Sequence, residues 1–181
     1  MIKNNPQYYD AHWMPYTSNR EFKANPRIMV SAKDSYYIDD KGRKIFDGLS
    51  GLWTCGAGHS RPEILEAVSK QIETLDYSPA FQFGHDKSFE LANRIIELTP
   101  KDLDRVFFTC SGSEAVDSAL KIARAYWRHK GKFGKTRLIG RVKGYHGVNF
   151  GGISVGGIGP NREMFGPVSY THLTLPTNRE V

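Results

Sequence analysis

The chain has 181 residues, of which 39% are hydrophobic and 24% charged, a composition typical of a globular protein rather than a disordered or fibrous one. No apolar run approaches the roughly 20 residues of a membrane span, and the N-terminal residues lack the apolar stretch of a signal peptide. The net charge of +6 comes from scattered basic residues, so we interpret it as a solvated surface rather than a nucleic-acid-binding block.

Two cysteines, Cys55 and Cys110, lie far apart in the sequence, so we expect neither a disulfide framework nor a zinc site. They fit a reducing compartment, and we therefore expect a cytoplasmic protein. The histidines include no H-E-x-x-H pair and no grouping with cysteine, so no metal site is expected.

Residues 1 to about 30 are polar and aromatic, and prolines interrupt any long element there. We interpret this stretch as an N-terminal arm, whose aromatic side chains either cover the chain's own core or reach a partner subunit. Alternating residues then flank Gly42, which can supply the positive φ of a tight turn, so residues 35–46 are predicted to form a β-hairpin. Arm and hairpin together make up a first region, residues 1–50.

The stretch 47–59 is rich in glycine and has neither helical nor strand periodicity. Loops of this kind, held on a scaffold, often carry function. Trp53 lies in its middle and is either a core tryptophan or a flat wall for a substrate.

Two helices are predicted next. Ser60 and Glu63 make a capping-box pattern around Pro62, a residue favoured in the first helical turn. A second helix is predicted over residues 86–98 and is ended by Pro100.

The centre of the chain is predicted to be a strand, a short junction and a long helix. Val106–Phe108 is an apolar run short enough for a buried strand, and apolar residues then recur at helical spacing as far as Lys130. The junction between them, residues 109–114, is small, hydroxylated and contains glycine.

This junction predicts a phosphate cup at the start of the helix. Gly112 lets the backbone approach an anion closely, Ser111 and Ser113 can donate hydroxyl hydrogen bonds, and the helix N-terminus favours negative charge. The alternative is an ordinary helix start, with a serine N-cap and Glu114 in the first turn.

Residues 137–142 are predicted to form another strand, followed by Gly144-Tyr145-His146-Gly147. Open α/β sheets bind ligands at the carboxyl ends of their strands, so an aromatic residue between glycines is expected to contact a ligand there. The order of helices and strands predicts a layered α/β fold.

Residues 152–156 match the G-x-S-x-G motif of serine hydrolases around Ser154, but that motif needs a strand before it and a helix directly after it. The sequence Gly157-Ile-Gly-Pro-Asn161 disfavours such a helix, and no downstream Asp and His complete a triad. A hydrolase is therefore the least favoured interpretation.

Five separate blocks of the sequence resemble the class III aminotransferases, which are pyridoxal-phosphate (PLP) enzymes of fold type I. These blocks are HWMPYT at 12–17, DGLSGLW at 47–53, AGHSRPE at 57–63, FTCSGSEA at 108–115 and GYHG at 144–147. Residues 137–147 and 150–158 are similar to the omega-amino acid–pyruvate branch of that class. The resemblance runs from residue 8 to residue 167, and Cys110 departs from it where relatives often carry asparagine.

The resemblance implies roles for individual residues. Gly112 and Ser113 would bind the cofactor phosphate, with Ser111 supporting the turn. Tyr145 would stack on the pyridine ring, and His146 would shape the same loop. Trp53 would line the substrate pocket.

The resemblance also implies that this chain is a fragment. Residues 51–167 would be the first part of the large PLP-binding domain, and the lysine that forms the Schiff base would lie beyond residue 181, so no catalytic residue is assigned and the chain alone is expected to be inactive. Residues 168–181 do not continue the family pattern, and we interpret them as an artefactual tail. The exposed apolar faces of such a fragment predict poor solubility.

By this resemblance, the whole protein would transfer an amino group from an omega-amino acid or amine to pyruvate, and would be a homodimer or homotetramer without nucleic-acid or membrane partners. Another class III aminotransferase or an aminomutase is the alternative within the family. An alternative of a different class is a basic, non-catalytic module that binds phosphate or nucleic acid.

Overall fold

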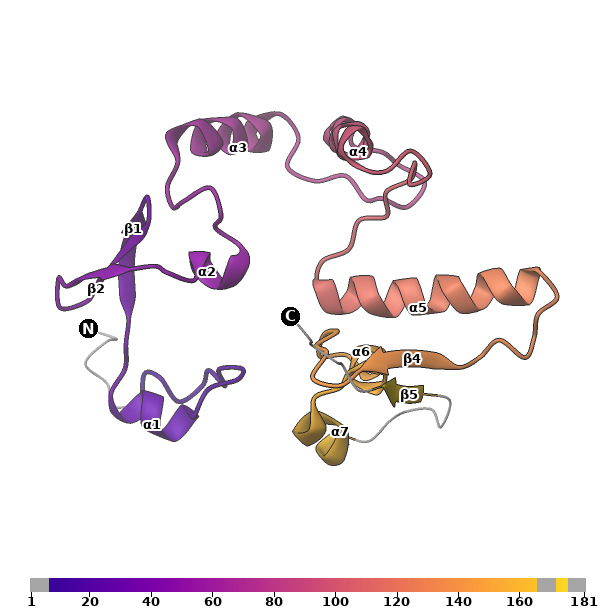
Figure 1. Cartoon of the computed structure of the whole chain (residues 1–181). Helices are drawn as coiled ribbons and strands as arrows, with labels where there is room; N and C mark the ends of the chain where they lie inside the picture. The colour runs from indigo at the N-terminus through magenta and orange to yellow at the C-terminus, as the bar shows by residue number, and fades with distance from the viewer. Residues whose placement is uncertain (1–6, 166–171, 176–181) are drawn as a thin grey trace, which may run out of the picture. The chain divides into compact units, whose positions relative to one another are not determined.

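The computed structural model describes residues 7–165 and 172–175 of the chain (Figure 1). These residues belong to two compact units, Met1–Asp86 and Lys87–Val181. The first unit includes residues 51–86, which the sequence analysis assigned to the cofactor domain. The predicted domain boundaries, after residues 50 and 167, stay predictions.

The first unit contains a three-stranded antiparallel sheet in the order β1-β2-β3, which is preceded by α1 and followed by α2 and α3. Its elements are α1 (Asn19–Ala24), β1 (Met29–Lys33), β2 (Tyr36–Asp39), β3 (Lys44–Phe46), α2 (Ser50–Trp53) and α3 (Pro62–Thr74).

The predicted hairpin is confirmed as β2 and β3, with Tyr37 opposite Ile45. Gly42 adopts a φ of 76° in its turn, as expected. The buried carboxylate of Asp39 closes this turn by accepting hydrogen bonds from the backbone N–H groups of Lys41 (3.0 Å) and Arg43 (2.8 Å). Strand β1 was not predicted, because the polar and aromatic residues up to about 30 resemble an irregular arm.

The start of α3 differs from the prediction. Pro62 is the first helical residue, as expected, but the N-cap is Arg61 and it makes no side-chain capping hydrogen bond. The hydroxyl of Ser60 instead donates to the carbonyl oxygen of Ala32 (2.8 Å), so it ties the loop to β1. The capping-box prediction is therefore wrong.

The second unit is organised around the long helix α5. Its elements are α4 (Asp86–Leu98), α5 (Gly112–His129), β4 (Leu138–Arg141), α6 (Phe150–Val155), α7 (Gly159–Phe165) and β5 (His172–Leu175). The predictions of α4, α5 and β4 are confirmed. Strand β5 pairs in parallel with β4 and falls within the predicted tail, while residues 168–171 and 176–181 of that tail lie outside the described residues.

Residues Val106–Phe108 do not form the predicted buried strand. Phe107 and Phe108 are exposed, and in the described part of the chain no strand pairs with them. A strand is completed by hydrogen bonds to a neighbouring strand, so an apolar run alone cannot make one.

Helix α6 packs closely against β4 (Figure 1). A side chain at Gly140 would overlap the carbonyl oxygen of Val155, so only glycine fits at this contact. Ile153 and Val155 are buried here, whereas the only other buried hydrophobic side chain of the described residues is Phe22 in the first unit. Trp13 and Tyr16 of the arm are each 86% exposed, so they do not cover a core of this chain.

Candidate cofactor site

The first turn of α5 is capped by its own side chains. Ser111 has an extended backbone, and its Oγ accepts a hydrogen bond from the N–H of Glu114 (3.1 Å). The Glu114 carboxylate in turn accepts from the N–H of Cys110 (2.9 Å). This is a variant of the capping box, so the ordinary helix start considered above is present.

This capping leaves donors for an anion. The amides of Gly112 and Ser113 belong to the first helical turn, where the backbone offers no intrahelical acceptor. Gly112 is exposed, and a Cβ built on it would have no other atom within 4 Å. The helix start therefore has both open space and the positive end of the helix dipole, and the two interpretations of this junction are compatible.

The Gly144–Gly147 segment lies against this helix start. The N–H of Val148 donates to Ser113 Oγ (2.9 Å), which leaves the hydroxyl proton of Ser113 available for an acceptor. Gly147 has a φ of 101°, and a Cβ there would approach Ser113 Cα to 2.7 Å. Only glycine allows both this backbone conformation and this contact.

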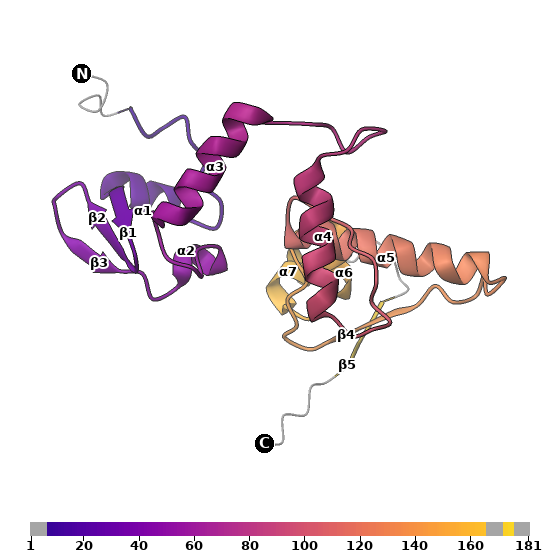
Figure 2. The same ribbon diagram turned by 90° about the horizontal axis from the view of Figure 1, so that it is seen from above.

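One turn further along α5, Asp117 also holds the loop. Its Oδ1 accepts a hydrogen bond from the buried N–H of Gly152 (3.0 Å), at the start of α6. Sequence reasoning did not single out Asp117, although its four-residue spacing from Ser113 places both side chains on one helix face. Figure 2 shows α6 beside the first turns of α5.

The predicted site residues of the second unit thus come from adjacent segments. Ser111, Gly112 and Ser113 form the helix start, and Tyr145 and His146 lie in the loop that is bonded to it. Tyr145 is 57% exposed, so its ring is not packed in the core and is accessible to a ligand.

Trp53 lies in the first unit, on α2. It is 77% exposed, so the alternative that it is a core tryptophan is wrong. Asp47, which precedes it, accepts hydrogen bonds from the N–H of Gly51 (2.8 Å) and from His59 Nε2 (2.7 Å). The hydrogen bond from His59 is the main cause that holds the pKa of Asp47 below its ordinary value, and burial opposes it.

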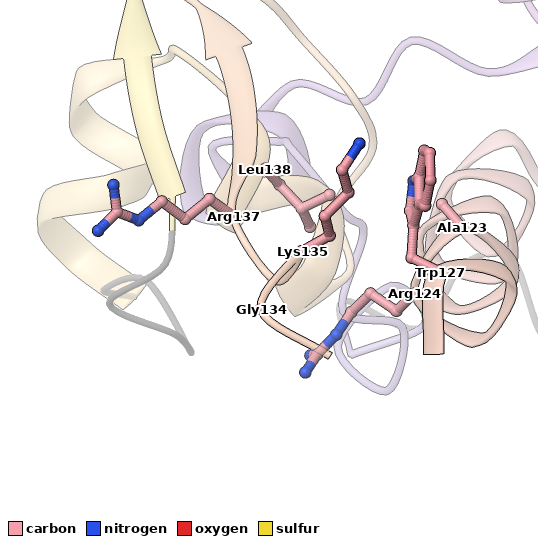
Figure 3. Close-up of a pocket in the computed structure, with 7 residues that line it drawn as sticks. All are labelled: Ala123, Arg124, Trp127, Gly134, Lys135, Arg137 and Leu138. Carbon is pink, nitrogen blue, oxygen red and sulfur yellow. The ribbon is translucent and has the colours of Figure 1, made fainter. Parts of the chain in front are cut away.

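A groove in the surface lies at the other end of α5 (Figure 3). This groove, of about 580 Å³, is lined in part by Arg124, Trp127, Lys135 and Arg137. Lys135 Nζ lies 3.5 Å from the centre of the Trp127 ring. The guanidinium groups of Arg124 and Arg137 point away from that contact, so the basic side chains do not converge on one phosphate position.

The hydrolase motif has the wrong structural context. Ser154 lies inside α6 and is 1% exposed, whereas a nucleophilic serine must be accessible at a strand-to-helix turn. The expectation that Gly157–Asn161 excludes a helix is wrong, because α7 begins at Gly159. Pro160 is tolerated there because the first turn needs no N–H donor from it.

Within residues 7–165 and 172–175, no helix is long and apolar enough to cross a membrane. The same residues contain no group of three or more side chains that could hold a metal ion. Cys55 and Cys110 are free thiols.

Residues 17–181 match the family described as Aminotransferase class-III. The chain belongs to the class III aminotransferases. An omega-amino acid–pyruvate aminotransferase from Pseudomonas putida is 62% identical over 157 residues, and a beta-alanine–pyruvate aminotransferase from Pseudomonas aeruginosa is 64% identical over 156 residues. These alignments cover 87% and 86% of this chain but 35% of each relative, so the chain spans about a third of the length of these aminotransferases.

Solved transaminase structures share this part of the fold. A transaminase from the marine bacterium Virgibacillus has a TM-score of 0.87 and 35% identity, over 93% of this chain and 39% of its own. An amine transaminase from an uncultivated Pseudomonas species, in a PLP-bound form, has a TM-score of 0.85 and 34% identity, over 92% of this chain and 38% of its own. The predicted aminotransferase fold is therefore confirmed for this chain.

Proposed function

We propose that the protein containing this chain is a PLP-dependent aminotransferase that moves an amino group from an omega-amino acid, such as beta-alanine, to pyruvate. The family match and the two relatives above 60% identity support this reaction. The observation that carries the proposal is the open helix start at Gly112, to which the Tyr145 loop is tied by the hydrogen bond from the N–H of Val148 to Ser113 Oγ.

The residues at this helix start fit a phosphate group. The amides of Gly112 and Ser113 and the hydroxyl of Ser113 would supply three donors to the phosphate of PLP, while Ser111 stays committed to capping Glu114. The dianion would also gain from the helix dipole. When bound, PLP supplies the electron sink that lets a substrate amine lose its α-proton.

The aromatic residues are proposed to shape the rest of the site. Tyr145 would stack on the pyridine ring, with His146 setting the conformation of its loop, and both proposals are supported by the hydrogen bond that ties this loop to Ser113. Trp53 would form one wall of the substrate pocket, a role supported by its exposure.

We further propose a cytoplasmic homodimer or homotetramer. The free thiols of Cys55 and Cys110 support a reducing compartment. The exposed aromatic side chains of Trp13 and Tyr16 support an arm that packs on a second subunit.

The test is a transamination assay with the complete gene product, supplied with PLP, pyruvate and a panel of amino donors. We expect alanine to form with beta-alanine as donor and to require PLP. A preference for ornithine, or amino-group migration within one substrate, would assign another class III reaction. Absence of any PLP-dependent amino transfer would contradict the proposal.

A further inference from the structure

The turn that carries Trp53, labelled α2, has a backbone conformation that its residues do not favour. Four successive residues, Ser50, Gly51, Leu52 and Trp53, have φ angles of 50°, 58°, 60° and 69°. Glycine adopts this left-handed region readily, but the other three residues are opposed by contacts of their Cβ atoms. A run of this kind persists only where surrounding contacts hold it in place.

Asp47 makes those contacts from within the same loop. Its carboxylate accepts hydrogen bonds from the N–H groups of Leu49 (3.3 Å) and Gly51 (2.8 Å), at the entrance to the turn and inside it. It also accepts from His59 Nε2 (2.7 Å), because a carboxylate offers only acceptors. The side chain of Asp47 is 7% exposed and that of His59 is 12% exposed, so this group of contacts is shielded from water.

Both partners are fixed to the small sheet of the first unit. The N–H of Asp47 donates to the carbonyl oxygen of Ser35 (2.8 Å), and His59 exchanges two backbone hydrogen bonds with Asp34 (2.7 and 3.0 Å). The ring of Tyr37, on β2, packs against His59 with 4.5 Å between ring centres. The turn is therefore held in a defined position relative to the β1–β2 connection.

The turn itself closes tightly. The N–H of Cys55 donates to the carbonyl oxygen of Ser50 (2.8 Å), and Thr54 Oγ1 donates to that of Gly51 (2.7 Å). A Cβ on Gly51 would lie 2.9 Å from Cys55 Sγ, so no larger residue fits there without displacing that side chain. A polar network around the shielded side chains of Asp47 and His59 thus supports a turn whose last residue, Trp53, presents its indole to solvent.

We propose that Asp47 is a positioning residue, which clamps the left-handed turn and so sets where the Trp53 indole stands in the amino-donor pocket. This inference rests on the proposed function for the pocket role of Trp53, but not for the clamp itself. Asp47 acts through the backbone of the turn, and His59 fixes the orientation of its carboxylate.

Asp39 provides a matched control. It is a buried carboxylate on the same sheet and likewise accepts backbone hydrogen bonds in a turn, but none of its contacts reaches residues 47–59. Asn in place of either aspartate replaces one carboxylate oxygen by an NH2 group, so each variant loses the negative charge and the hydrogen bonds that this one oxygen accepts, and general destabilisation should affect both variants similarly. Only Asp47→Asn should act on Trp53.

The first experiment measures the clamp without reference to activity. The complete gene product is labelled with fluorotryptophan, and the fluorine NMR signal of Trp53 is identified by its loss in Trp53→Phe. We expect Asp47→Asn, and separately His59→Gln, to shift or broaden that signal, whereas Asp39→Asn leaves it in place. An unchanged Trp53 signal in both Asp47→Asn and His59→Gln would overturn the inference.

The second experiment measures the consequence for substrate choice. For Asp47→Asn we expect kcat/KM to fall by roughly tenfold to a hundredfold, as for other misplaced pocket residues. The loss should arise mainly from a higher KM, and it should differ between a small and a bulky amino donor. In Asp39→Asn, the ratio of kcat/KM for the small donor to that for the bulky donor should stay at the wild-type value. If the Trp53 signal moves in Asp47→Asn while this ratio stays at the wild-type value, Asp47 positions Trp53 but Trp53 does not select the substrate. That result would overturn the pocket part of the inference. Inactivity of the wild-type protein would instead contradict the proposed function and leave the NMR result as the test of the clamp.

Discussion

Ser113 shows how one side chain can serve both the loop and a ligand. Its oxygen accepts the N–H of Val148, and this bond positions the aromatic loop, while its own proton stays available to an acceptor. Ser111 differs, because its oxygen caps Glu114. The two serines of the junction therefore have different roles. Ser111 caps the helix, whereas Ser113 joins the helix to the loop and keeps a hydroxyl proton for an anion.

Gly112→Ala is predicted to weaken PLP binding without harming the fold. No atom lies within 4 Å of a Cβ at this position, and alanine is the better helix former, so stability should be unchanged or slightly raised. A methyl group next to the helix start should nevertheless lower PLP affinity by about tenfold or more, because it obstructs close approach of the phosphate to the backbone.

Equilibrium dialysis with PLP, alongside thermal denaturation, measures both effects of Gly112→Ala. The matched control is Gly159→Ala, since Gly159 is also the first residue of a helix with no atom near its Cβ. Equal PLP affinity in the wild-type protein and Gly112→Ala would argue against a phosphate at this helix start.

The contact between α5 and the loop that follows β4 organises the proposed site. Ser113 and Asp117 lie on one face of α5 and bind the backbone N–H groups of Val148 and Gly152 respectively. Gly147 and Gly151 allow the close approach, because a Cβ at either position would collide with those same two side chains. The loop is therefore fastened at two points, one helical turn apart.

Asp117→Ala is predicted to loosen this loop. The change leaves the buried N–H of Gly152 without its acceptor, at a cost of about 1–3 kcal/mol, whereas Asp117→Asn keeps an acceptor oxygen and should cost less. Hydrogen exchange over residues 144–152 should accelerate in Asp117→Ala and remain near wild type in Ser118→Ala, its neighbour on the helix. Unchanged protection in Asp117→Ala would mean that the loop is held by other contacts.

The first unit is predicted to lose stability in acid through two carboxylates. Burial alone would raise the pKa of Asp39, but hydrogen bonds from Arg43 and Lys41 outweigh it and hold that pKa below its ordinary value. The pKa of Asp47 is lowered chiefly by the hydrogen bond from His59. Since each folded-state pKa lies below the unfolded value, the stabilisation is complete above the ordinary carboxyl range and is lost as the pH falls through the folded-state pKa.

Unfolding free energies measured against pH would check this prediction. Asp39→Asn and Asp47→Asn should each show a shallower loss of stability in acid than the wild-type protein, because each removes one carboxylate that must be protonated. A wild-type slope retained in both variants would show that other groups govern the acid response.

These elements also show which features could be predicted from sequence. Local patterns predicted the β2–β3 hairpin around Gly42 and the helices that begin near Pro62 and Gly112, because turn preferences, the preference of proline for a first helical turn and the serine N-cap of α5 act over a few residues. The strand at Val106–Phe108 was predicted wrongly, since pairing depends on distant residues. The contacts of Asp117 with Gly152 and of Asp47 with His59 were missed for the same reason, because they join residues 35 and 12 positions apart. The short-range contacts of Asp47 with Leu49 and Gly51 follow the turn preferences of aspartate and were overlooked.

The described residues bury few of their apolar side chains. Ile64 and Val68 on α3 and Leu91 on α4 belong to regular apolar stripes, yet each is half exposed. Such stripes normally face a core. The chain spans about a third of its relatives' length, and the exposed stripes fit a family domain in which further residues cover them.

The 181-residue chain expressed alone is therefore predicted to aggregate. Its exposed apolar stripes should bind a hydrophobic dye strongly and drive association, in contrast to the complete gene product. Size-exclusion chromatography and dye fluorescence of both proteins at equal concentration would measure the difference. A monodisperse chain of 181 residues with little dye binding would contradict the prediction.

We propose above all that the backbone N–H groups of Gly112 and Ser113 hold the phosphate of PLP. The most direct measurement follows the amide chemical shifts of these two residues in the complete gene product while PLP or pyridoxal, which lacks the phosphate, is added. We expect large shifts of both amides with PLP, small ones with pyridoxal, and loss of the PLP response in Gly112→Ala. Saturating PLP that leaves both amides unmoved, or pyridoxal that moves them equally, would contradict it.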